Sequence, residues 1–122
     1  TIVFGDGWYG QEGSGGSWWR WMAGESTIIV PGSTRDRRLH LVLEYPTDTR
    51  DRTTLYVALD GEPLEVSARP SDGAIDIVIP LPPLQRERTI TMQVTSTVRP
   101  IDVGYSGDTR VLGARLVVCE LG

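Results

Sequence analysis

Hydrophobic and polar residues alternate along most of this chain with a period of two. Over residues 38–45, the apolar side chains Leu39, Leu41, Leu43 and Tyr45 fall on one face, and the polar residues fall on the other. Alternation of this kind predicts a β-strand with one buried face and one solvated face.

The same pattern recurs in short runs that turn-forming residues separate. Strands are therefore expected over residues 17–22, 26–31, 38–45, 54–60, 62–67, 74–80, 88–96 and 111–121. Asp60-Gly61 and the stretch 70–73 carry the residues typical of tight turns. Pro80, Pro82 and Pro83 are expected to end the strand before them, because proline has no N–H to donate to a central ladder.

No stretch keeps a helical period over the roughly 10 residues that a helix prediction needs. About eight short strands with one-sided alternation predict an all-β fold, an antiparallel β-sandwich of jelly-roll or Greek-key type. The 122 residues contain no repeat and no linker, so a single domain over residues 1–122 is expected. The chain begins with Thr1, which suggests a processed chain or a domain of a larger protein.

Composition narrows the class of protein. The net charge is −4 and the arginines are spread along the chain, which argues against a nucleic-acid partner. No apolar run approaches the ~20 residues of a membrane span. The absence of Lys and Asn indicates a GC-rich genome, is compatible with a thermophile, and excludes N-glycosylation. Cys119 is the only cysteine, so no internal disulfide forms, and its apolar neighbours predict a small buried hydrophobe.

The stretch 5–21 is unusual because it holds all four tryptophans, separated by glycine and serine. Glycine-rich backbone costs conformational entropy to order, so we expect a functional face or its support here. If residues 17–22 form a strand, Trp19 and Trp21 point one way and Trp18 and Arg20 the other. One pair is then expected in the core and the other on the outer face or at a rim.

Trp8 or Tyr9 is expected to join the exposed pair. An exposed indole usually serves binding, and sugar rings with apolar C–H faces are common partners for such a platform. The alternative is that the aromatic rings fill the end of the sandwich while the glycines let the backbone pass close to them. The sequence leaves both interpretations open.

Charged residues near this segment and before the last strand are the other candidates. Asp108 and Arg110, two positions apart, are expected on one face at the mouth of a strand. They could bind a polar ligand, or they could lock the loop by pairing with each other or with Arg20 and Glu12. Glu12 with Asp108 could imitate the carboxylate pair of a glycosidase, although two acids among sixteen form no signature.

The sequence contains no motif that is typical of a metal or cofactor site. His40 is the only histidine and no His/Cys cluster exists, which argues against zinc or another transition metal. Calcium held by loop oxygens stays an alternative without a supporting motif. We find no phosphate-binding loop, dinucleotide fingerprint or nucleophile elbow, so no cofactor is expected.

Two stretches together resemble a bacterial carbohydrate-binding or galactose-binding-like β-sandwich module. They are Gly7-Trp8-Tyr9 with Glu12 and Trp19-Arg20-Trp21-Met22, and Asp108-Thr109-Arg110-Val111-Leu112-Gly113 before the last strand. Modules of this kind accompany glycosyltransferases and surface-polysaccharide proteins. The resemblance implies a non-catalytic accessory domain at an extracytoplasmic or cell-surface location. It also implies that the first and last strands pair, which would bring the tryptophans near Asp108 and Arg110.

The leading hypothesis is therefore a module that binds or positions a glycan. Under this hypothesis Trp8, Tyr9 and Trp18 stack on sugar rings. Hydrogen bonds to hydroxyl groups, or support of the loop, come from Glu12, Arg20, Asp108 and Arg110. One alternative is a structural domain whose aromatic end docks on its parent protein or a neighbouring domain. The other is a jelly-roll glycan hydrolase or lyase, which would need two acids converging in a cleft.

Overall fold

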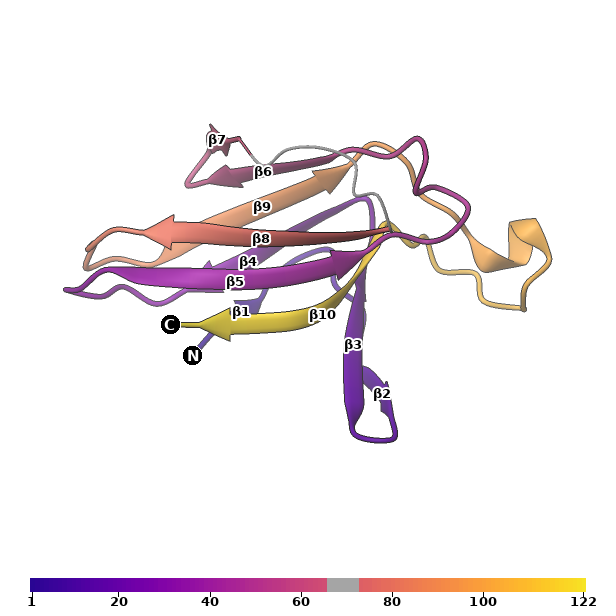
Figure 1. The fold of residues 1–122 in the computed structure, drawn as a ribbon, viewed down its shortest axis with the longest axis horizontal. Coiled ribbons are helices and arrows are strands. Elements are labelled where there is room, and N and C mark those ends of the chain that lie inside the picture. The colour runs from indigo at the N-terminus through magenta and orange to yellow at the C-terminus, as the bar shows by residue number, and fades with distance from the viewer. Residues whose placement is uncertain (66–72) are drawn as a thin grey trace.

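The computed structural model describes residues 1–65 and 73–122, and it is an antiparallel β-sandwich of two sheets (Figure 1). One sheet has the order β1 (Val3–Phe4), β4 (Glu25–Val30), β9 (Arg88–Val94), β6 (Leu55–Leu59) and β7 (Glu62–Leu64). The other has the order β2 (Glu12–Ser14), β3 (Ser17–Met22), β10 (Ala114–Leu121), β5 (Arg37–Glu44) and β8 (Ala74–Leu81). The predicted all-β sandwich is confirmed.

The strand order is that of a jelly roll. Apart from the short β1 and β2, the sheets read β4-β9-β6-β7 and β3-β10-β5-β8, so the chain changes sheet at every connection except the β6–β7 hairpin. Strand β3 pairs with β10 in the register Arg115 opposite Trp21. The expected pairing of the first long strand with the last is therefore present.

The core lies between the two sheets, where the alternating positions meet. Leu39, Leu41, Leu43 and Tyr45 of the β5 region are all buried, as the pattern predicts. They form one cluster with inward residues of the neighbouring strands: Ile75, Ile77, Ile79, Ile28, Val30, Leu55, Val57, Ile90, Met92 and Val94. Burial of these side chains is the main favourable contribution to folding.

The prediction that Pro80 ends its strand is wrong by one residue. Strand β8 continues to Leu81, which is buried, and Pro80 lies opposite Arg38 in the ladder. Because β8 is the last strand of its sheet, Pro80 stands on an edge where no partner needs its N–H. The hairpin at Asp60-Gly61 is confirmed by the β6–β7 pairing. Residues 66–67 of the expected strand and 70–72 of the expected turn lie outside the described residues.

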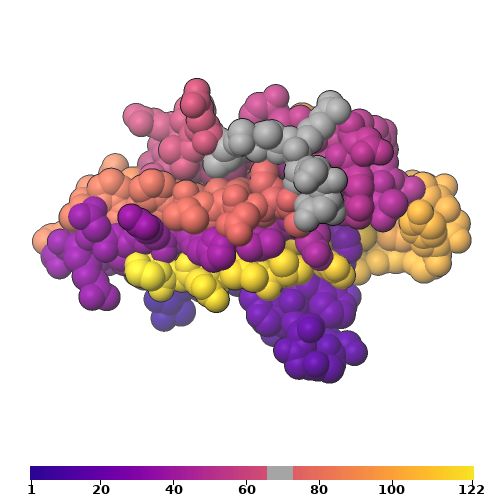
Figure 2. Space-filling model, viewed as in Figure 1, coloured from indigo at the N-terminus to yellow at the C-terminus, as the bar shows by residue number. Residues whose placement is uncertain are grey.

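Two features extend beyond the sheets. The connection from β9 to β10 carries a 3-10 helix, η1 (Pro100–Val103), at the end of the sandwich opposite the two termini (Figure 1). The β2–β3 hairpin projects away from the sandwich body (Figure 2). Strand β10 starts at Ala114 instead of 111, because Leu112 forms a separate bridge to Val98.

Candidate functional site

The side chains of β3 divide between the two faces of its sheet. Met22 is fully buried and Trp18 packs against the core cluster, so this alternate set faces inward. Trp19 and Trp21 face outward, where the guanidinium of Arg115 lies 5.4 and 5.7 Å from their ring centroids. The outward pair is therefore Trp19 and Trp21, and Trp18 belongs to the inward set.

Trp8 makes two contacts at the edge of the other sheet. Its indole Nε1 donates a hydrogen bond of 2.9 Å to the Thr27 carbonyl oxygen, and its ring meets Phe4 edge-on at 5.2 Å. The Arg20 guanidinium stacks over the Phe4 ring at 4.4 Å and donates to the carbonyl oxygen of Tyr9 at 2.9 Å. Trp8 and Arg20 thus hold the N-terminal segment against the sandwich.

The remaining predicted residues gather around Arg110. Its guanidinium donates to the Asp108 carboxylate at 2.8 Å and to the Glu12 carboxylate at 3.1 Å, and it lies 5.2 Å from the centroid of the Tyr9 ring. The Tyr9 hydroxyl donates to the Val111 carbonyl oxygen at 2.9 Å. Hydrogen bonds from the Arg110 side chain and backbone lower the pKa of Asp108. We call these four residues, Tyr9, Glu12, Asp108 and Arg110, the Arg110 cluster.

The ion pairs of the Arg110 cluster hold the loop before the last strand in place, which is one of the two roles expected for Asp108 and Arg110. The cluster joins the N-terminal segment to the β9–β10 connection, and Glu12 and Asp108 share one guanidinium. The structure thus brings four of the seven predicted site residues together, with Arg20 joined through the Tyr9 backbone. Trp8 and Trp18 lie apart from that cluster against the core. A ligand role for the seven residues stays a prediction.

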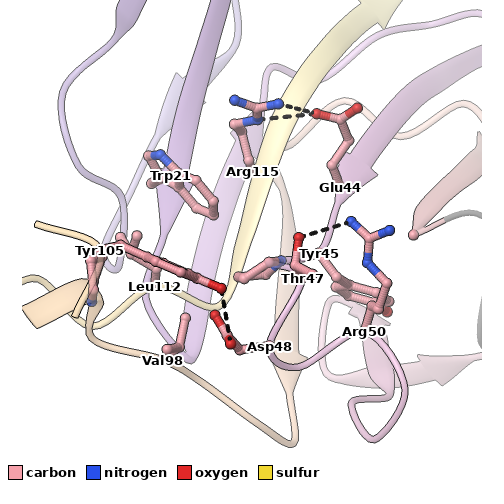
Figure 3. Close-up of a pocket in the computed structure, with 13 residues that line it drawn as sticks. Trp21, Glu44, Tyr45, Thr47, Asp48, Arg50, Val98, Tyr105, Leu112 and Arg115 are labelled. Atoms are coloured by element: carbon pink, nitrogen blue, oxygen red, sulfur yellow. Dashed lines mark hydrogen bonds and ion pairs between the residues drawn. The ribbon is translucent and has the colours of Figure 1, made fainter. Parts of the chain in front are cut away.

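A pocket of about 340 Å³ lies beside η1, whose Pro100 is part of its lining, and Figure 3 shows the side chains that surround it. Strand ends and loops from several parts of the chain meet there, as is usual for binding sites carried on a rigid scaffold. Its lining comes from the end of β3, the end of β5 with the following turn, Gly73 before β8, the β9–β10 connection and the start of β10. Its charged side chains and its two less buried aromatic rings are Trp21, Glu44, Asp48, Arg50, Tyr105 and Arg115.

Aromatic rings and paired charges form one part of this pocket. The Tyr105 side chain is exposed, with 68% of the residue surface accessible, and its hydroxyl donates to Asp48 at 3.4 Å. Arg115 donates through Nε and Nη2 to one carboxylate oxygen of Glu44 at 3.1 and 2.6 Å, and it also contacts the Trp21 ring. The Arg115–Glu44 pair fixes both side chains beside the indole.

Arg50 lies on the opposite side of the pocket from Tyr105 (Figure 3). It belongs to a turn in which the Arg50 N–H donates to the Pro46 carbonyl oxygen at 3.1 Å. Its Nη2 contacts the Thr47 hydroxyl at 3.5 Å, a weak interaction. The pocket therefore combines aromatic rings with side chains that donate hydrogen bonds and side chains that accept them.

Sequence reasoning missed the pocket residues, although two signals pointed to them. Met22 continues the alternation of Trp18 and Arg20, and an apolar residue before the next strand marks that set as the buried one. Tyr105 stands between Gly104 and Ser106, a turn context that exposes a side chain. Glu44, Asp48, Arg50 and Arg115 carry no motif, because only the fold brings them together.

Within residues 1–65 and 73–122, no group of three or more His, Cys, Asp or Glu side chains is arranged to hold a metal ion. In the same described part of the chain, no helix is long and apolar enough to cross a membrane.

Comparison with known proteins finds structural neighbours of low sequence identity. No family model and no curated protein matches the chain. A crystal structure of exo-β-1,3-galactanase from Phanerochaete chrysosporium with galactose matches at a TM-score of 0.45 and 14% identity, covering 97% of this chain and 29% of that one. A variant of the same enzyme with β-1,3-galactotriose matches at a TM-score of 0.43 and 20% identity. That match covers 97% of this chain and 26% of the enzyme chain. The chain thus spans just over a quarter of that enzyme's length.

Proposed function

We propose that this domain binds carbohydrate, without cleaving it, in the pocket between Trp21 and Tyr105. The observation that carries the proposal is the combination of the Trp21 and Tyr105 rings with Glu44, Asp48 and Arg115 in one open pocket. Its volume of about 340 Å³ falls at the lower end of the range typical of small-molecule sites, roughly 300–1,000 Å³.

The chemistry of the lining fits a sugar. A pyranose ring presents apolar C–H groups on its faces and hydroxyl groups around its rim. Aromatic rings bury the faces, and carboxylates and guanidinium groups serve the hydroxyls as acceptors and donors. Asp48 accepts only from Tyr105 at 3.4 Å among the described contacts, so its oxygens have capacity for ligand hydroxyls.

The position of Glu44 supports binding without catalysis. A general acid has to reach the oxygen that it protonates, and the Glu44 carboxylate is instead engaged by Nε and Nη2 of Arg115 at 3.1 and 2.6 Å. In this proposal Glu44 orients Arg115, and the pocket positions a glycan for a parent protein or neighbouring domain. The glycosyltransferase association and the extracytoplasmic location implied by the resemblance are part of the same proposal.

The test is calorimetric titration of the domain with a panel of oligosaccharides, with and without calcium. Tyr105→Ala is expected to weaken binding at least tenfold, because it removes an exposed ring that packs on the ligand. Tyr56→Ala is the matched control, since Tyr56 is 59% exposed on β6 of the other sheet. Equal loss in both variants, or no binding by the wild-type domain, would contradict the proposal.

Trp21→Ala and Trp19→Ala form a second matched pair. Both indoles lie on the outer face of β3 and both contact Arg115, but only Trp21 lines this pocket. Binding is expected to fall in Trp21→Ala and to persist in Trp19→Ala. Circular dichroism of each variant checks that the fold is retained.

A second candidate function is docking to another protein, and the β9–β10 connection favours it. Ile101, Val103, Tyr105 and Val111 are all exposed there, between 38% and 68%. Exposed apolar side chains gathered on one loop mark partner sites as well as ligand sites. The double variant Ile101→Ser, Val103→Ser separates the two functions, because neither residue lines the pocket: loss of self-association or partner binding with intact glycan binding favours docking.

A further inference from the structure

Arg50 is held in place by its own backbone turn. The N–H groups of Thr49 and Arg50 both donate to the Pro46 carbonyl oxygen at 3.1 Å, and Thr53 donates to Thr49 at 2.9 Å. Thr49 and Thr53 are buried, so the turn is anchored to the body of the domain. A guanidinium on such a base is positioned before any ligand arrives.

The hydrogen-bonding capacity of Arg50 is largely unused. A guanidinium has five N–H donors, and the described contact of this side chain is the 3.5 Å interaction with Thr47. Its Nε is buried and has no hydrogen-bond partner, and no ion pair involves Arg50 in residues 1–65 and 73–122. Its two Nη groups hold four of the five donors and make only the weak Thr47 contact among the described ones, so a guanidinium without an ion-pair partner favours an anion on this side of the pocket.

Gly73 makes room for this guanidinium. A Cβ at Gly73 would lie 2.7 Å from Cζ of Arg50 and 3.0 Å from its Nε. Gly73 also has a φ of +84°, which disfavours side chains there independently. The absence of a side chain at Gly73 therefore lets the Arg50 guanidinium pack directly against the Gly73 backbone.

Neither of the two carboxylates that line the pocket, Glu44 and Asp48, forms an ion pair with Arg50 among the described contacts. Arg115 is paired with Glu44 at 2.6 Å. Asp48 is exposed and accepts from the Tyr105 hydroxyl, and it forms no ion pair within the described part of the chain. The pocket thus has a cationic side at Arg50 and a hydroxyl-accepting side at Asp48 and Tyr105, which Figure 3 shows across from each other.

We infer that the ligand of this pocket is an acidic saccharide whose carboxylate pairs with Arg50. The inference rests on the proposed function and specifies it: the sugar face packs on the aromatic side, its hydroxyls reach Asp48, and its acid group accepts from the two Nη groups of Arg50. A planar carboxylate matches the fork of a guanidinium through two parallel hydrogen bonds.

The experiment is calorimetric titration with uronic-acid oligosaccharides and with the same oligosaccharides as methyl esters. The ester keeps the ring and the hydroxyls and removes the charge. The wild-type domain is expected to bind the acids about tenfold more tightly than the esters, which is the effect of one charge-assisted hydrogen-bonded pair. Arg50→Gln is expected to reduce binding of the acids to the level of the esters.

Arg52→Gln is the matched control, because Arg52 stands in the same turn, is exposed and does not line the pocket. It removes the same charge and should keep the preference for the acids. Equal binding of acids and esters by the wild-type domain, or an unchanged preference in Arg50→Gln, would overturn the inference while the proposed function stands. Absence of binding by any saccharide would overturn both.

Discussion

Arg110 donates a hydrogen bond of 3.1 Å to Glu12 across 98 positions of sequence. The contact joins the glycine-rich N-terminal segment to the connection that precedes the last strand. Both side chains are about one-third exposed, so the pair is only partly shielded from solvent. The same connection carries Tyr105, so the pair helps to position one wall of the pocket.

Removing this pair should cost a modest amount of stability. A double-mutant cycle of Glu12→Gln and Arg110→Gln is expected to give a coupling energy of about 0.5–1 kcal/mol, as for other partly exposed ion pairs. Urea unfolding of the four proteins measures it. Glu62→Gln, an exposed residue of β7, is the control and should change stability by less. A coupling energy of zero would show that the contact does not stabilise the loop.

Asp60 should make the stability of the domain depend on pH. The backbone N–H of Thr89 donates to its carboxylate at 2.8 Å and the Arg88 guanidinium also binds it, and together these lower the pKa of Asp60. A lowered pKa in the folded state stabilises the fold above the unfolded value of about 3.9, and this contribution is lost as pH falls through the folded value.

We therefore expect Asp60→Asn to be less stable than the wild type at pH 7, with a difference that shrinks as the pH falls from about 5 to 3. Asparagine tolerates the positive φ of 50° at this turn, so the backbone is preserved. Urea unfolding across this pH range gives the comparison. Asp36→Asn, which removes a carboxylate at an exposed site, is the control. A constant difference between Asp60→Asn and the wild type would refute the assignment.

Gly113 should not tolerate a side chain. A Cβ there would lie 2.4 Å from the carbonyl oxygen of Ala23 and 2.7 Å from Cγ2 of Val94. Gly113→Ala is expected to lower the free energy of unfolding by about 1–3 kcal/mol, because the neighbouring backbone must shift. Gly10→Ala, where the added methyl meets open space, is the control and should stay within about 0.5 kcal/mol. Thermal unfolding distinguishes the two outcomes.

Cys119 should react slowly with alkylating reagents. Burial, and secondarily the charge of Glu120, raises the pKa of Cys119 to about 11. Because the thiolate is the nucleophile, labelling by iodoacetamide at pH 8 is expected to be about a hundredfold slower than for a free cysteine. Labelling in denaturing urea should restore the free rate. Rapid labelling of the folded domain would show that the thiol is not shielded.

Much of the site lay beyond prediction from the sequence, for a reason that β3 illustrates. The alternation of Trp18, Trp19, Arg20 and Trp21 defines two faces, but either face could have been the inner one until neighbouring strands were placed. The Trp18 side chain faces inward because it lies on the same face of β3 as Met22, which packs in the core. The outward-facing tryptophans are consequently the other pair, Trp19 and Trp21, which are partly buried.

What the sequence determined by itself is the class of fold. A period of two is local, because successive side chains of a strand point to opposite faces, so the buried positions Leu39, Leu41 and Leu43 could be predicted without any partner strand. The pocket was decided by the tertiary structure alone. Arg50, Tyr105 and Trp21 are distant in sequence and share no motif, and they meet only because the jelly-roll order places three chain segments at one end of the sandwich.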